Sequence, residues 1–121
     1  MKVIYIAGPY RSQLGKWQVR LNIRRAEEAA VFVWQHGGVA LCPHKNTAGF
    51  GGVPGCSDAT WLSGDIELLK RCDAVLAIDE WASSQGARLE VIYANKAGIP
   101  VFYTAQEVVD YLAESQKVDQ E

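Results

Sequence analysis

The residues best suited to chemistry stand between Asp79 and Glu90, directly after the apolar run 74–78. Ser84 and Gly86 open a helical pattern here, and the hydroxyl and backbone N–H groups at a helix start can bind an anion. Glu90 follows about a turn and a half inside that helix, among apolar neighbours. The spacing predicts an anion subsite with a carboxylate beside it; the plain alternative is that Glu90 lies on a solvated helix surface.

Two further candidates are Arg11, just after Gly8-Pro9, and Asp65, in a second helical pattern. Arg11 follows the first apolar run, where a guanidinium can hold a phosphate or carboxylate at two points. Asp65 has a plain reading as a charge that the dipole favours at a helix N-terminus. The phosphate-loop spacing is absent, because six residues separate Gly8 from Gly15, and there is no GxGxxG motif. A nucleoside triphosphatase or a dinucleotide-dependent dehydrogenase is therefore poorly supported.

Strand and helix patterns alternate around these candidates. Short apolar runs predict buried strands, and apolar positions at steps of three and four predict helices. We expect strands at 2–7, 39–42, 74–78 and 100–103, and helices at 17–36, 58–71, 84–96 and 105–115. Segment 45–57 holds five glycines and prolines and is expected to be a long loop, while the polar tail, about 116–121, is expected to fray.

This alternation predicts one α/β domain over residues 1–121. Its sheet should be small, parallel and doubly wound, like that of flavodoxin or Rossmann folds, with four to five strands and flanking helices. Ligands bind such sheets beyond the carboxyl ends of the strands. We therefore expect the site where residues 8–11, 43–46 and 79–86 meet. In segment 43–46 the candidate is His44, and the alternative is that it is an ordinary histidine of a loop.

Composition narrows the function classes. The 121 residues carry a formal net charge of −2, which gives no electrostatic footprint for nucleic acid or for an anionic membrane. Three cysteines and two histidines show no metal-ligand spacing, so we expect neither a metal nor a disulfide framework. No apolar run has the length of a signal peptide or a membrane span. We expect a soluble, cytoplasmic protein.

Four stretches, in order, resemble the nucleoside 2-deoxyribosyltransferase superfamily, and within it the 2′-deoxynucleoside 5′-monophosphate N-glycosidases. They are residues Ile4–Arg11, Pro43-His44, Asp65–Asp73 and Ser84–Glu90. The last is the most specific, because the family spacing of a Ser or Asp, a Gly and the catalytic Glu falls on Ser84, Gly86 and Glu90. The chain departs from the hydrolases at Pro9, where they often carry a phosphate-binding Ser.

The resemblance implies roles for individual residues. Glu90 is similar to the family's nucleophile, Asp65 to its base-side carboxylate and Tyr5 to its active-site tyrosine. Arg11 resembles the phosphate-side arginine. Ser84 stands where transferases acting on free nucleosides carry an Asp, and a hydroxyl tolerates a 5′-phosphate that a carboxylate repels. The expected substrate-binding residues are Gly8, Tyr10, Arg11, His44, Trp61, Ser84 and Gly86.

One hypothesis concerns the base. Trp61 precedes Asp65 by one turn on the same helix face, so indole and carboxylate can both reach a base while the loop 45–57 closes over it. The alternative is that Trp61 fills the core and the loop is merely a long connection.

The first reading is an N-glycosidase that hydrolyses the base–sugar bond of (deoxy)nucleoside 5′-monophosphates without a metal or organic cofactor. Two alternatives stay open: base exchange between deoxynucleosides, which needs the same Glu90, and a non-enzymatic nucleotide-binding domain. The resemblance also implies a homodimer or larger homo-oligomer, since family members complete the active site with a neighbour's residues.

Overall fold

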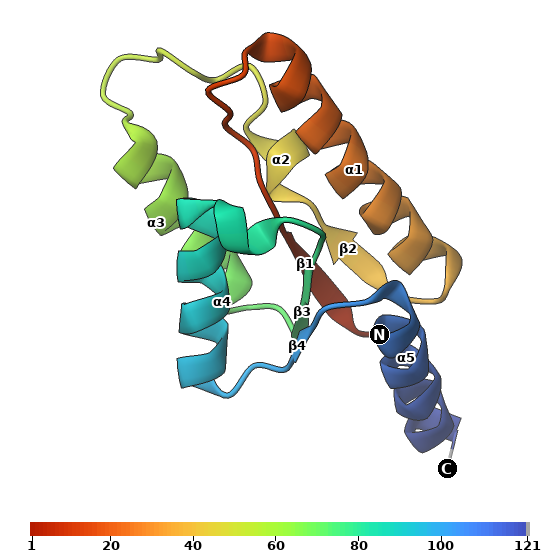
Figure 1. Ribbon diagram of the computed structural model, residues 1–121. Coiled ribbons are helices and arrows are strands. Elements are labelled where there is room, and N and C mark those ends of the chain that lie inside the picture. Colours follow the sequence, from red (N-terminus) through yellow and green to blue (C-terminus); the bar gives the residue numbers. More distant parts are fainter. Residues whose placement is uncertain (121) are drawn as a thin grey trace.

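Strands and helices alternate along the chain, of which the computed structural model describes residues 1–120 (Figure 1). The strands are β1 (Val3–Ala7), β2 (Val39–Leu41), β3 (Ala74–Ala77) and β4 (Val101–Phe102). The helices are α1 (Lys16–Gln35), α2 (Pro43–Asn46), α3 (Asp58–Leu69), α4 (Gln85–Ala97) and α5 (Ala105–Gln120), with one 3-10 turn, η1 (Trp81–Ser83).

The four strands form a single parallel sheet in the order β2-β1-β3-β4. In the register of its central pairs, Ile4 stands opposite Ala40 on β2 and opposite Ala74 on β3. The chain moves outward from β1 to β2, crosses back to β3 and continues to β4. This reversal beside β1 creates the crevice in which open α/β sheets bind ligands. The doubly wound α/β class expected from the sequence is confirmed, with four strands.

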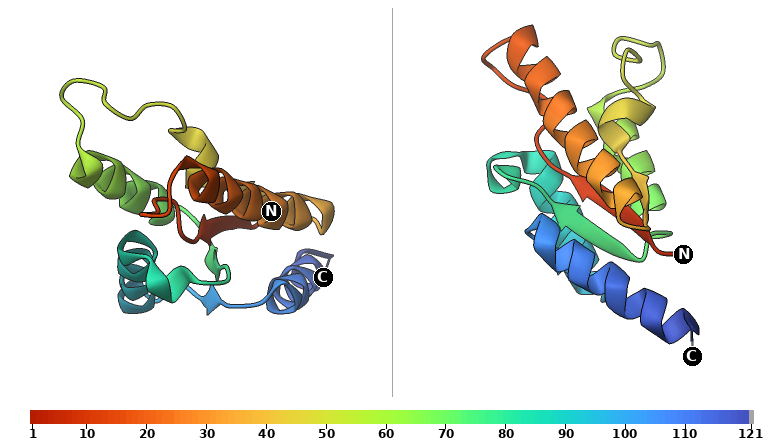
Figure 2. Two further views of the ribbon diagram at one scale, coloured as in Figure 1. Left: turned by 45° about the horizontal axis from the view of Figure 1, so that its top comes forward. Right: turned by 90° about the vertical axis from the view of Figure 1, so that its right-hand side faces the viewer.

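Helices cover both faces of the sheet (Figure 2, left): α1 and α5 lie on one face, α3 and α4 on the other. Strand residues alternate between these layers, so Ile4 and Ile6 pack with α1 and α5, whereas Tyr5 and Ala7 face α3 and α4. Burial of β1 on both faces explains why its sequence is apolar throughout. Tyr5 is therefore directed to the layer that also contains Asp65 and Glu90.

Local signals set the helix ends. Ser57 and Thr60 form a reciprocal capping box at the start of α3, and the Ser84 side chain accepts a hydrogen bond from Ala87 N at the start of α4. Gly37 and Gly98, with φ of 87° and 75°, follow α1 and α4 in left-handed conformations that favour glycine. The expected bounds of these helices hold to within one or two residues.

Three expectations about local structure are corrected. The exit of β2 is a short helix, α2, because Pro43 at its first position fits helical geometry, so the loop before α3 spans only 47–57. The segment before α4 is not simply a loop, because it contains the 3-10 turn η1. Helix α5 continues to Gln120 through the segment expected to fray, since its Gln and Lys residues favour helix; residue 121 lies outside the described residues.

In the part of the chain that the structure describes, no helix combines the length and apolar character that a membrane crossing requires.

Candidate active site

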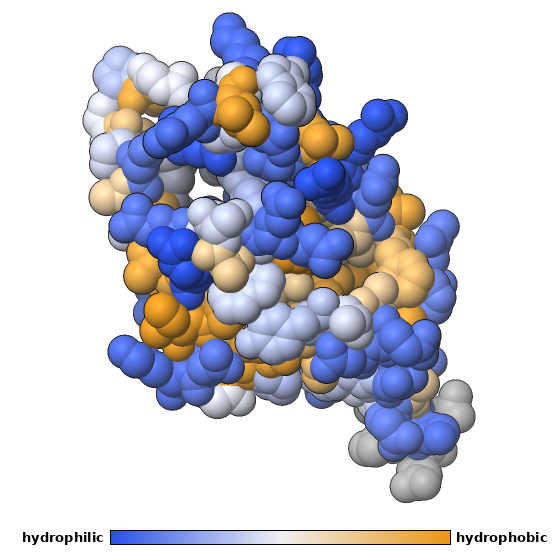
Figure 3. Space-filling view, in the orientation of Figure 1, coloured by the Kyte–Doolittle hydropathy of each residue, from blue (hydrophilic) through white to orange (hydrophobic). Residues whose placement is uncertain are grey.

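A cleft of about 1060 Å³ opens at the carboxyl ends of the strands. The loop after β1, the N-terminal half of α1, helix α2 and the N-terminal ends of α3 and α4 form its walls. The surface is hollowed between the upper end of α3 and the loop after β1, and its rim is largely hydrophilic (Figure 3). The cleft therefore lies where the topology of the sheet predicts a ligand site.

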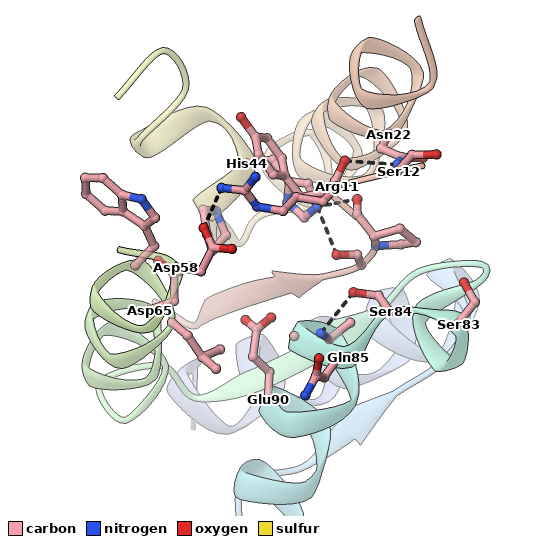
Figure 4. A pocket seen from close by; sticks show the side chains of 18 of the residues that line it. Arg11, Ser12, Asn22, His44, Asp58, Asp65, Ser83, Ser84, Gln85 and Glu90 are labelled. Carbon is pink, nitrogen blue, oxygen red and sulfur yellow. Dashed lines mark hydrogen bonds and ion pairs between the residues drawn. The ribbon is translucent and has the colours of Figure 1, made fainter. Parts of the chain in front are cut away.

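Glu90 projects from α4 into this cleft (Figure 4). Only 8% of the residue is exposed, so the solvated-surface alternative is wrong. Helix α4 packs against β1 and β3, which puts the carboxylate of its sixth residue over the strand ends rather than in water. Burial raises the pKa of Glu90 to about 7. An interaction with Tyr5 opposes this shift, and the charge of Asp65 adds to it. A carboxylate with these properties marks a candidate functional site.

Asp65 faces the same space from α3. It is the eighth residue of that helix, so its reading as a helix N-terminal charge is wrong. Burial raises the pKa of Asp65 to about 6. The charge of Asp65 in turn raises the pKa of Glu90, so the two carboxyl groups lie close enough for their charges to interact.

Tyr5 lies beneath the two carboxylates and is completely buried. Burial raises the pKa of its phenol, with the charge of Glu90 and a hydrogen-bonding interaction with it as the next causes. The hydroxyl nevertheless has no partner at full hydrogen-bond geometry among the described residues. Tyr5 and Glu90 thus face each other at the floor of the site, close enough to perturb each other's pKa without a formed bond.

The start of α4 forms one side of the cleft. The Ser84 oxygen accepts from Ala87 N at 3.2 Å, which leaves the hydroxyl proton available to a ligand. The first backbone bond of the helix runs from Arg88 N to Ser84 O at 2.9 Å, so the amides of Gln85 and Gly86 precede the helical ladder. Open space surrounds the position of a Cβ on Gly86, so a ligand can approach the backbone closely there.

Two buried polar side chains hold the loop after β1. His44 is 6% exposed, and its Nε2 donates to the carbonyls of Gly8 and Pro9 at 3.1 and 2.9 Å. Burial lowers the pKa of His44, against these two bonds, and favours the neutral ring. From α1, Asn22 donates to the carbonyl of Tyr10 at 3.1 Å. The loop that carries Arg11 is therefore anchored from both sides.

Gly8 allows the segments that follow β1 and β3 to pack closely against each other. A Cβ at this position would collide with the Ile78 side chain, while Ile78 N donates to Ala7 O at 2.9 Å. Packing against Ile78 therefore explains a glycine at position 8, in addition to its place in the cleft wall.

Arg11 reaches across the mouth of the cleft. Its Nη2 lies 2.6 Å from Asp58 Oδ1, so the loop after β1 is joined to the first residue of α3 (Figure 4). Both side chains are largely exposed. The guanidinium expected to meet a phosphate is thus paired with a carboxylate of the protein.

Trp61 lines the cleft one turn before Asp65, and it belongs to neither of the two buried core clusters. Its ring centre is 6.2 Å from that of Phe50, an exposed residue of the loop 47–57. The loop thus places one aromatic side chain beside the indole. This arrangement is consistent with the aromatic wall expected from the sequence.

The cleft gathers nine of the ten residues expected to act in the site, and Tyr5 lies in the layer beneath it. Lining residues that the sequence analysis missed include Gln18, Asn22, Arg25, Asp58, Leu62 and Glu80. The first three share one face of α1, a spacing visible in the sequence, but their polar character there resembles an ordinary solvated helix surface. Glu80 has a positive φ of 66°, which nothing in the sequence marks.

Comparisons with known proteins give a family for the sequence and a solved structure with a similar fold. Residues 2–103 match the family model described as Domain of unknown function (DUF4406). The chain is also similar to a solved structure of 2-deoxyribosyltransferase from the psychrotolerant bacterium Bacillus psychrosaccharolyticus, with a TM-score of 0.60 and 20% identity. That match covers 82% of this chain and 69% of the other. No curated protein matches the sequence.

Proposed function

The chain belongs to the family described as Domain of unknown function (DUF4406), and from the geometry of its cleft we propose that it cleaves the N-glycosidic bond of a nucleoside or nucleotide. The observation that carries this proposal is Glu90, a buried carboxylate at the edge of an open cleft, with a pKa raised to about 7. The chain has the fold of a 2-deoxyribosyltransferase, and its sequence resemblance to that superfamily assigns the role of the nucleophile to Glu90.

The reaction proposed is a double displacement at the anomeric carbon of the sugar. The Glu90 carboxylate attacks that carbon, the C–N bond breaks, and its electron pair leaves with the base. Asp65 contacts the departing base and supplies the proton when it is in its acid form. Water then attacks the anomeric carbon of the glycosyl ester and gives a proton to the Asp65 carboxylate, which releases the sugar and restores both the Glu90 carboxylate and the acid form of Asp65. The pKa of Asp65, about 6, suits a group that exchanges a proton near neutrality. Glu90, with a pKa of about 7, attacks from its ionised form.

A 5′-monophosphate is the substrate that Ser84 and Arg11 favour. Ser84 offers a hydroxyl proton and stands beside the free amides of Gln85 and Gly86, a combination suited to phosphate oxygens. Arg11 lies across the same cleft and carries the positive charge that a phosphate requires. The base then occupies the side of Asp65 and Trp61.

Base exchange is the second candidate, and one observation favours it: the solved structure with the same fold is named as a 2-deoxyribosyltransferase. The two reactions share the attack by Glu90 and differ only in whether water or a second base accepts the sugar. A cleft of about 1060 Å³ lies at the upper end of the range for small-molecule sites, so volume does not decide between them.

The test is to incubate the protein with a panel of nucleosides and their 5′-monophosphates and to follow free base by chromatography. Base release without an acceptor supports hydrolysis, and exchange that depends on an added base supports transfer. Glu90→Ala should abolish either reaction, whereas Glu28→Ala, at an exposed position of α1, serves as control. Loss of a covalent nucleophile costs several powers of ten in rate, so a twofold effect at Glu90 would contradict the mechanism.

A further inference from the structure

The Arg11–Asp58 pair occupies the place where the proposed function needs an anion. Asp58 Oδ1 lies 2.6 Å from Arg11 Nη2, which is the geometry of a charge-assisted hydrogen bond. The pair bridges two segments 47 residues apart in sequence, and both residues line the cleft. The Asp58 carboxylate therefore holds the guanidinium as an anionic ligand would.

The charge balance of the cleft makes this pairing consequential. Among the described residues that line the cleft, two are cationic, Arg11 and Arg25. Four are acidic: Asp58, Asp65, Glu80 and Glu90. His44 adds no positive charge in its neutral form, which burial favours. Asp58 neutralises one of the two cations, so a dianionic group that enters the cleft finds less free positive charge to bind.

The pair is nevertheless weak enough for a ligand to displace. Its side chains are 66% and 73% exposed, and exposed ion pairs are worth only a small part of the energy of a buried one. A phosphate offers two charges and three acceptor oxygens against the single charge of Asp58. The guanidinium also keeps further N–H donors for a ligand while Nη2 is engaged.

We propose that Asp58 determines specificity: it competes with the anionic group of the substrate for Arg11 and thereby sets the preference between phosphorylated and unphosphorylated nucleosides. This inference rests on the proposed function for the identity of the substrate, but not for the existence of the anion subsite. Removal of the Asp58 charge should tighten the binding of phosphate and leave the binding of an uncharged nucleoside unchanged.

The experiment measures binding by calorimetry with inorganic phosphate, a 2′-deoxynucleoside and its 5′-monophosphate. Asp58→Asn should bind inorganic phosphate roughly three- to tenfold more tightly than the wild type, and the gain should shrink with added salt. Asp58→Ser should show the same gain, which separates loss of charge from an effect on α3. Glu28→Gln removes one exposed charge outside the cleft and is the matched control.

The gain must depend on Arg11. In an Arg11→Gln background, Asp58→Asn should leave phosphate affinity unchanged. Equal or weaker phosphate binding by both Asp58 variants in the native background would overturn the inference, since Asp58 would then orient Arg11 or play no part. Because this readout needs no turnover, it is independent of the proposed reaction. If no nucleoside or nucleotide releases base but the gain is seen, only the proposed function fails.

Discussion

Replacement of Glu90 by Gln should stabilise the fold at neutral and alkaline pH. Burial raises the pKa of Glu90 from its ordinary value of 4.5 to about 7, so the folded state holds this proton more tightly than the unfolded chain. The contribution of Glu90 to stability is therefore lost as the pH rises from about 4.5 to about 7, and no more is lost above. Gln has nearly the same shape and carries no charge at any pH.

The size of the effect follows from the difference between the two pKa values. At about 1.4 kcal/mol for each unit, the cost of burying the ionised Glu90 is about 3 kcal/mol at about pH 8 and below about 1 kcal/mol at about pH 5. Three kcal/mol is a large part of the total stability of a domain of this size. A residue kept at this cost is one whose charge has a use other than stability.

Urea unfolding of the wild type and Glu90→Gln at these two pH values measures the difference directly, with the exposed Glu28→Gln as control. The expected result is a gain for Glu90→Gln that grows by about 2 kcal/mol between about pH 5 and about pH 8. A gain that is equal at both pH values, or a loss at about pH 8, would refute the argument that Glu90 is buried as a charge.

Four further outcomes are expected. Tyr5→Phe removes the interaction that lowers the pKa of Glu90, so the acid limb of the pH–rate profile should move to higher pH while the fold loses no stability; an unmoved limb would separate Tyr5 from Glu90. Ser84→Asp should weaken monophosphate binding about tenfold and favour nucleosides, and an unchanged ratio of the two affinities would place the phosphate elsewhere. In hydrogen exchange, a bound monophosphate should protect the amides of residues 47–57, whereas equal exchange with and without ligand would show that the loop does not close. Light scattering should show a dimer or larger assembly at micromolar concentration; a monomer alone would remove that expectation.

Local sequence determined most of the fold. Apolar runs such as Val3–Ala7 are typical of strands buried on both faces of a parallel sheet. The glycines that follow α1 and α4 end those helices through their own conformational freedom. The spacing of Ser84, Gly86 and Glu90 also predicted that these residues share the start of one helix, because the cap and the carboxylate stand on one segment of regular geometry.

Tertiary structure alone decided how the candidate residues are charged and paired. Glu90 and Asp65 come from different helices, and their raised pKa values arise from burial against neighbours that are distant in sequence. Asp58 reads locally as a favourable first residue of α3, and only the folding of a loop 47 residues away brings Arg11 to it. Sequence patterns report periodicity along one segment, whereas desolvation and ion pairing depend on what other segments place around a side chain, and here that surrounding separates a surface charge from a site.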